Sequence, residues 1–335
     1  MRYINVERTK MVDEASIGHT PTPLFASIMR FILVFILGTI LGNLVAAIPL
    51  GIYLLTGTDL MEVIGSVTAG TMNEEQYIEA INTILLNIPP IFTVISLVCT
   101  ASSIVAAVFY CRYFEKRRLP SMGFRKGKAG LEYLVGALIG MGMYAVTFLI
   151  AWATGSVSIK LNPDGFAPII LLFLVGYIIQ GASEEILLRG YFMITLARDM
   201  KPWSALMISS LMFSLLHAFN PGVSVIGLIN IMLFGMFMGI YVFKRGNIWG
   251  ACAIHTFWNF AQGNIFGSYV SGTSLAPSVF VMSYNPDRLL ANGGAFGLEG
   301  GAAATIILVL AIGITLFTKT NKKELSVLEQ PLFNV

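Results

Sequence analysis

Long apolar runs dominate the chain, and short polar segments separate them. Eight runs are long enough to cross a bilayer, because a helix rises ~1.5 Å per residue and needs about 20 apolar residues to span the hydrocarbon core. We expect spans at residues 27–55, 88–111, 131–153, 167–196, 203–219, 223–243, 247–266 and 301–318. The pattern predicts an all-α integral membrane protein with about eight transmembrane helices.

The composition agrees with this assignment. The chain is 56% hydrophobic and 12% charged, whereas soluble domains are about a quarter charged. The 3 cysteines lie within or beside apolar runs, which excludes a disulfide framework and a cysteine-rich metal site. Basic residues form short clusters beside apolar segments, a pattern that favours contact with membrane lipid over nucleic acid.

The distribution of lysine and arginine predicts the orientation. With the N-terminus in the cytoplasm, all of the 21 basic residues except Lys160 and Arg288 fall on the cytoplasmic side. Such a bias is expected because lysine and arginine in short loops resist translocation. We therefore expect a multi-pass protein of the cell membrane with both termini cytoplasmic. The first 26 residues do not resemble a cleaved signal peptide.

Three of the expected spans carry polar residues that lipid disfavours. An ionisable side chain at the centre of a span costs roughly 2.5–3.5 kcal/mol on insertion scales, so each one calls for an explanation. These residues are Gln180, Glu184, Glu185 and Arg189 on the fourth span, His217 on the fifth, and His255 and Asn259 on the seventh.

Helical spacing gives the two adjacent carboxylates different surroundings. Glu185 and Arg189 are four residues apart and share a helix face, so they can form an ion pair. Glu184 is rotated by about 100° from Glu185 and has no such partner. The paired carboxylate is expected to stay ionised and hold its helix, whereas the unpaired one suits proton transfer.

The remaining motif residues also pair at helical spacing. Phe213 precedes His217 by four residues, and His255 precedes Asn259 by four. Taken singly, each feature has a structural interpretation: a helix-locking ion pair, an interface histidine, or hydrogen bonds between helices. Together they predict one cavity that could activate a water and stabilise an oxyanion.

The sixth span adds two packing features. Its Gly235-Met-Phe-Met-Gly239 sequence is a GxxxG motif, which is typical of close helix packing. Asn230 on the same span could cap a helix or line the cavity.

The combined pattern resembles a known family, the intramembrane proteases of the CAAX-processing and bacteriocin-immunity type, called CPBP or Abi. Its pattern is Glu-Glu-x-x-x-Arg, then Phe-x-x-x-His, then His-x-x-x-Asn or Asp. The chain supplies Glu184-Glu185-x-x-x-Arg189, Phe213-x-x-x-His217 and His255-x-x-x-Asn259 in that order. The resemblance covers roughly residues 168–265.

The resemblance implies roles for these residues. Glu184, assisted by His217, would activate a water for attack on a peptide carbonyl. His255 and Asn259 would stabilise the oxyanion, while Glu185 with Arg189 would order the site. Residues of this type have also been interpreted as metal ligands. The spacing favours the metal-free mechanism, because neither histidine belongs to a His-Glu-x-x-His motif.

The domain organisation follows from the spans and the resemblance. We expect a cytoplasmic tail (1–26), accessory transmembrane helices (27–165), a catalytic core (166–266), and an outer loop with the last helix and tail (267–335). The core would comprise four helices, the fourth to seventh spans. No cofactor is expected.

Three function classes remain open at this point. The favoured one is an intramembrane endopeptidase that acts on a hydrophobic, membrane-associated or lipid-modified peptide. A non-catalytic bacteriocin-immunity or scaffold protein would keep the fold and bind a partner. A proton-coupled transporter would use the same residue types in a relay, but we find no inverted repeat of the kind transporters show.

Overall fold

The computed structural model describes residues 6–163, 167–273, 277–318 and 320. The expected spans all coincide with helices. Five stretches are long and apolar enough to cross a membrane: α2 (Leu24–Thr56), α5 (Ile91–Cys99) with α6 (Ala101–Tyr113), α7 (Ala129–Ala153), α8 (Ile169–Glu185) continuing to α9 (Ile194–Ala197), and α11 (Val225–Arg245). A multi-pass, mostly helical protein is therefore confirmed.

Three of the helices are shorter than the spans expected from the sequence. Helices α10 (Pro202–Leu216) and α14 (Ala302–Phe317) are apolar but have fewer than 18 residues. Helix α12 (Trp249–Phe260) continues directly into a π-helical segment, η3 (Ala261–Ile265), and the helical stretch ends there. The observed ends of these helices lie within three residues of the expected ones.

The prediction of an all-α chain is wrong outside the helical core. Strands β1 (Val157–Leu161) and β2 (Phe280–Tyr284) pair antiparallel, from Val157 opposite Tyr284 to Leu161 opposite Phe280. Both strands lie in segments that the apolar pattern left as loops, where backbone groups need partners. The acidic segment 56–87 likewise folds into helices α3 (Leu60–Thr68) and α4 (Glu74–Leu86), the latter started by a capping box at Asn73.

Helix α12 is wedged between α7 and α8, and glycines make the contact possible. A Cβ atom on Gly136 or Gly140 of α7 would overlap a carbonyl oxygen of α12. A Cβ on Gly181 of α8 would lie 2.9 Å from the backbone nitrogen of Thr256. Three backbones thus pack at close range, as small residues allow in membrane helices.

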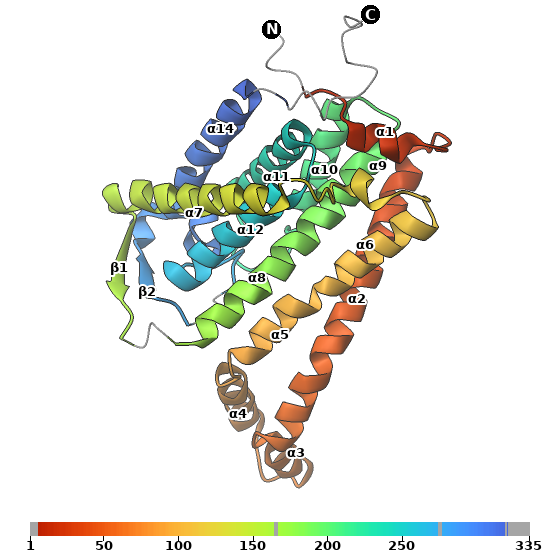
Figure 1. Cartoon of the computed structure of the whole chain (residues 1–335). Coiled ribbons are helices and arrows are strands. Elements are labelled where there is room, and N and C mark those ends of the chain that lie inside the picture. Colours follow the sequence, from red (N-terminus) through yellow and green to blue (C-terminus); the bar gives the residue numbers. More distant parts are fainter. Residues whose placement is uncertain (1–5, 164–166, 274–276, 319, 321–335) are drawn as a thin grey trace, which may run out of the picture.

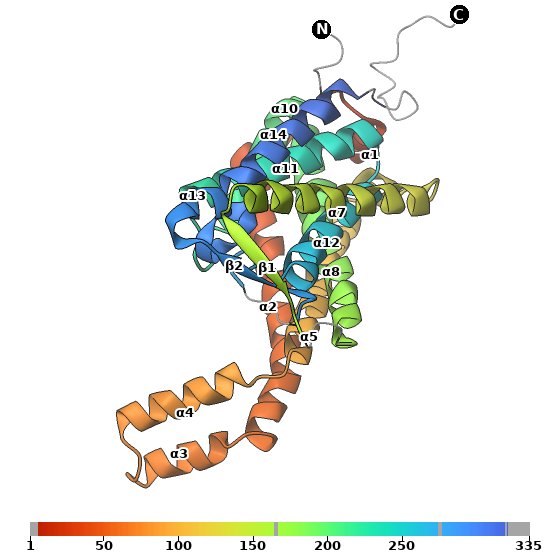
Figure 2. The same ribbon diagram turned by 90° about the vertical axis from the view of Figure 1, so that its left-hand side faces the viewer.

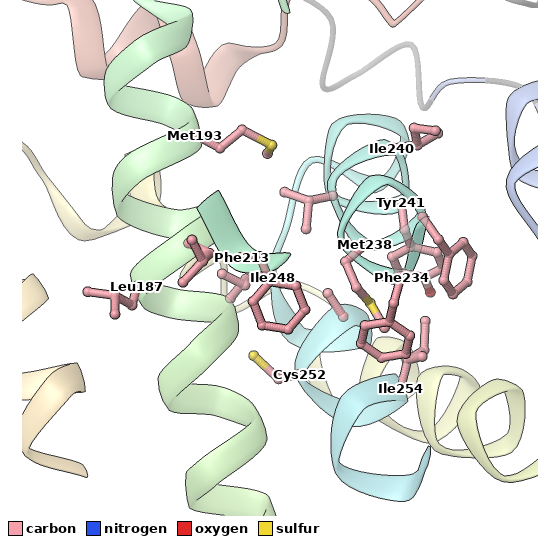
Figure 3. Packing of buried hydrophobic residues seen from close by; sticks show 14 of the residues in the cluster. Leu187, Met193, Phe213, Phe234, Met238, Ile240, Tyr241, Ile248, Cys252 and Ile254 are labelled. Atoms are coloured by element: carbon pink, nitrogen blue, oxygen red, sulfur yellow. The ribbon is translucent and has the colours of Figure 1, made fainter. Parts of the chain in front are cut away.

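Helices α10 and α11 form a second close helix contact. Gly235 of α11 faces Ser210 of α10, and Gly239 faces Leu206, so the GxxxG motif forms a close helix contact as predicted. Figure 3 shows the apolar cluster that fills the space between these helices, with Phe213, Phe234 and Ile254 among its members.

Helix α2 runs along the molecule to the α3–α4 pair, which projects away from the core (Figure 1, Figure 2). Helix α1 (Lys10–Ser16) and the end of α14 lie at the opposite end of the molecule in both views. The two described ends of the chain are therefore on the same side, and the assignment of that side to the cytoplasm stays a prediction.

The glycine contacts yield a stability prediction. Gly140→Leu should force α7 away from α12 and lower the melting temperature of the detergent-solubilised protein, because overpacking costs about 1–3 kcal/mol or more. Gly142→Leu on the same helix is the matched control, since a Cβ there meets nothing within 4 Å. Equal melting temperatures for the two variants would contradict the packing.

Candidate active site

A cavity of about 470 Å³ lies among the core helices. Helix α8 lines it with Gln180 and Glu184, α10 and its end with Phe213 and His217, and α12 with His255, Trp258 and Asn259. Helices α2, α5 and α6 close its other wall with Thr39, Thr93, Ser96, Thr100 and Ser103. The motif residues therefore converge although they lie on separate helices.

Glu185 lies behind this cavity and is fully buried. Its Oε1 accepts a hydrogen bond from Arg189 Nη1 at 3.1 Å and contacts His255 Nδ1 at 2.9 Å. The Arg189 side chain is only 1% exposed and its guanidinium stacks over the Phe213 ring at 4.5 Å. Two cationic or donor groups thus converge on one buried carboxylate oxygen, which stabilises its charge in place.

His255 connects the two adjacent carboxyl groups. With Nδ1 directed at Glu185, its Nε2 lies 3.6 Å from Glu184 Oε2. The imidazole orientation is therefore fixed by the buried carboxylate, and the opposite ring nitrogen faces the cavity.

Glu184 is the more exposed of the two carboxyls. Its side chain is 28% exposed, whereas that of Glu185 is 0% exposed. Within the described part of the chain, Glu184 Oε2 accepts no hydrogen bond, and Glu184 Oε1 accepts one from Gln180 Nε2. Glu185 is therefore paired with Arg189 on its own helix. The charged or donor neighbours of Glu184 are instead His255 at 3.6 Å and Gln180.

Gln180 links two of the predicted residues and was not assigned to the site from the sequence. Its Oε1 accepts a hydrogen bond from Asn259 Nδ2 at 3.1 Å, while its Nε2 bonds Glu184. A signal was available, because Gln180 precedes Glu184 by one helical turn on the same face.

His217 reaches the cavity because α10 ends one residue before it. It is the C-cap of that helix, and its Nδ1 lies 2.8 Å from the carbonyl oxygen of Phe213. A carbonyl oxygen accepts hydrogen bonds, so Nδ1 carries the proton and Nε2 is free to accept one. His217 Nε2 forms no hydrogen bond within the described residues.

Each carboxylate or amide motif is followed by a π-helical segment. The segment η2 (Ile186–Met193) begins directly after Glu185 and contains Arg189, and η3 begins two residues after Asn259. π-Helical turns are rare and occur mostly at functional sites, where they redirect side chains.

The two supporting residues named from sequence are also placed. Phe213 contacts both histidine rings, at centroid distances of 4.8 Å to His217 and 6.2 Å to His255. Asn230 lines the cavity and caps no helix of its own; its Nδ2 donates to the carbonyls of Glu299 and Gly301. No three His, Cys, Asp or Glu side chains among the described residues are arranged to hold a metal ion.

The model of one protein family, described as Type II CAAX prenyl endopeptidase Rce1-like, matches residues 166–261. Those residues form a domain of this family. The CAAX endopeptidase domain contains all seven motif residues placed above, which confirms the resemblance inferred from their spacing. A domain of this family implies intramembrane protease activity. No curated protein and no solved structure matches the chain.

The buried ion pair of the CAAX endopeptidase domain can be tested by stability. Arg189→Met should destabilise the protein by about 3–5 kcal/mol, because it leaves the Glu185 charge buried without its partner. Unfolding in mixed micelles would measure the loss. Arg112→Met, at an exposed arginine, is the control. Glu185→Gln combined with Arg189→Met should lose less than Arg189→Met alone; an equal or larger loss would contradict the pairing.

Proposed function

We propose that the chain is an intramembrane endopeptidase that cleaves a hydrophobic, membrane-associated or lipid-modified peptide through a water activated by Glu184. The observation that carries the proposal is the position of His255, fixed by buried Glu185 and facing the cavity beside Glu184. A scaffold needs no such preorganised pair of carboxyl groups.

Glu184 and His217 suit water activation. Both line the cavity, and each has an acceptor atom that accepts no hydrogen bond from a described residue: Glu184 Oε2, which lies 3.6 Å from His255 Nε2, and His217 Nε2. A general base must reach the proton that it removes, directly or through one water. In the proposed step, Glu184 takes a proton from water, the oxygen attacks the peptide carbonyl, and the proton passes to the leaving amine.

His255 and Asn259 suit oxyanion stabilisation. The imidazole donates its Nδ1 proton to Glu185, and protonation of Nε2 makes it a second donor toward the cavity. Asn259 Nδ2 now bonds Gln180 and is available to turn toward a developing negative charge. Preorganised donors of this kind supply a large part of catalysis in acyl-transfer sites.

Glu185 and Arg189 would act as positioning residues. They do not line the cavity, and their bond lies behind His255. Their buried charges hold the imidazole in one tautomer and one orientation, as an acid behind a catalytic histidine does in other enzymes.

The accessory helices favour an extended peptide as substrate. Thr93, Ser96, Thr100 and Ser103 recur at intervals of three and four residues along α5 and α6, and all four line the cavity. A peptide must be unwound to be cleaved, and at membrane depth its free N–H and C=O groups need partners. The hydroxyl row supplies these partners, so we propose that α2, α5 and α6 of the accessory region form the substrate-binding wall beside the 166–266 core.

Cleavage tests the proposal. Wild type should cleave members of a quenched-fluorescent library of hydrophobic and prenylated peptides, and Glu184→Ala should be folded but inactive. Because the proposed mechanism uses a carboxylate and no metal, a chelator should leave the wild-type rate unchanged. Loss of activity in chelator, with recovery on addition of a divalent metal, would replace the glutamic mechanism with a metallopeptidase mechanism.

Folded but equally inactive wild type and Glu184→Ala would count against catalysis altogether. Matched melting curves establish that both are folded. Binding of library peptides without cleavage would then favour the immunity or scaffold function.

Oxyanion stabilisation has its own signature. Asn259→Ala should lower kcat by about 10²–10³-fold with little change in KM, since the lost interaction forms mainly in the transition state. Steady-state kinetics on the best library substrate would measure this. An increase in KM at constant kcat would instead assign Asn259 to substrate binding.

A further inference from the structure

A second carboxyl group reaches the cavity from outside the CAAX endopeptidase domain. Glu299 lies in the short helix η6 (Leu298–Gly300), between β2 and α14, and lines the same cavity as Glu184 and His217. The family match ends at residue 261, so the family pattern assigns this residue no role.

The Glu299 carboxyl is held in a defined position. Its Oε1 accepts a hydrogen bond from the backbone N–H of Ser271, which also lines the cavity. The backbone carbonyl of Glu299 accepts a bond from Asn230 Nδ2 at 2.7 Å, and this bond fastens η6 to α11. The side chain of Gln262 lies within hydrogen-bonding reach of the carboxyl.

Glu299 lies in a cavity wall that has no permanently cationic side chain among its described residues. Two glutamates and two histidines line the cavity, but no lysine or arginine is among the described lining residues. Burial raises the pKa of Glu299, while the Ser271 N–H and His217 act in the opposite direction. A carboxyl in such a place gains more from a cation than an exposed one does, because water screens it less.

Unpartnered polar atoms lie near the same carboxyl. Tyr177 of α8 lines the cavity with only 1% of the residue exposed, and its hydroxyl lies within electrostatic range of Glu299 and bonds nothing in the described chain. Gln262 Oε1 is also buried without a partner there. A buried polar atom without a hydrogen bond is costly, so two of them near one carboxyl indicate a missing donor-rich ligand.

We propose that Glu299 and Tyr177 form a specificity subsite for a lysine or arginine side chain of the substrate. A lysine ammonium carries three donors and a guanidinium carries five, which match a carboxylate and unpartnered oxygen atoms. The subsite opens into the cavity that holds Glu184, so the group that enters it belongs to the chain being cleaved. This inference rests on the proposed function.

Peptide binding tests the subsite without requiring cleavage. The probes are fluorescent hydrophobic peptides that differ only in having lysine or norleucine at one position, moved along the sequence. Fluorescence polarisation with Glu184→Gln protein in detergent should show, at one position, a lysine preference of about tenfold, as expected for a desolvated charge pair. Adding Glu299→Gln should reduce that preference to about twofold or less, because the amide keeps the Ser271 bond but loses the charge.

Two further variants separate recognition from structure. Asp287→Asn removes an exposed carboxylate from the outer loop and should leave the lysine preference unchanged. Tyr177→Phe, on the Glu184→Gln background, should weaken lysine-peptide binding by about three- to tenfold while norleucine-peptide binding stays the same. If Glu299→Gln fails to fold, the Tyr177→Phe result alone tests whether the subsite recognises lysine.

The possible results distinguish the two proposals. Equal binding of lysine and norleucine peptides at every position, or equal loss of preference in Glu299→Gln and Asp287→Asn, would overturn the subsite. Cleavage by wild type without lysine preference would leave the peptidase and remove the subsite. A Glu299-dependent preference in a protein that cleaves nothing would support the subsite and count against the peptidase.

Discussion

The burial of the Glu185 charge is the constraint on which the rest of the site depends. A carboxylate at 0% exposure within membrane helices is tolerated only with charged or donor partners. Arg189 and His255 supply them from the same helix and from α12. Because both bonds meet at one oxygen, the separation of α8 from α12 is fixed, and the glycine contacts at Gly181 are part of the same requirement.

This arrangement separates the tasks of two neighbouring carboxyl groups. Glu185 is buried and paired and holds its neighbours in position, whereas Glu184 lines the cavity and one of its oxygens accepts no hydrogen bond from the described chain. His255 contacts both groups, so the position of Glu185 also fixes the imidazole that lies beside Glu184. A single turn of helix therefore holds both the rigid part of the site and the group proposed to react.

Sequence spacing predicted the parts of the site that lie on one helix. The four-residue intervals gave the Glu185–Arg189 pair, and the apolar runs gave the helices that carry it. Spacing could not show that His255 bridges both glutamates, because that depends on how α12 sits between α7 and α8. Glu299 gave no signal at all, since it lies in an irregular segment that only tertiary packing brings to the cavity.

The helix ends and the strands were missed for a related reason. His217 reaches the cavity because α10 stops at Leu216, and hydropathy does not mark that end. The pairing of β1 with β2 joins segments more than a hundred residues apart, which no local pattern encodes. Apolar periodicity thus predicted what crosses the membrane, while the cavity depends on the places where helices end.

The most direct test of the central claim, that His255 is held between two carboxyl groups, is a ¹⁵N NMR spectrum of histidine-labelled protein. The chain has only 3 histidines, so single variants assign the signals. The account predicts that His255 keeps a proton on Nδ1 in slow exchange, and that Glu185→Gln shifts this signal while Asp287→Asn does not. Fast exchange of the His255 Nδ1 proton, with a signal that does not shift in Glu185→Gln, would contradict the account.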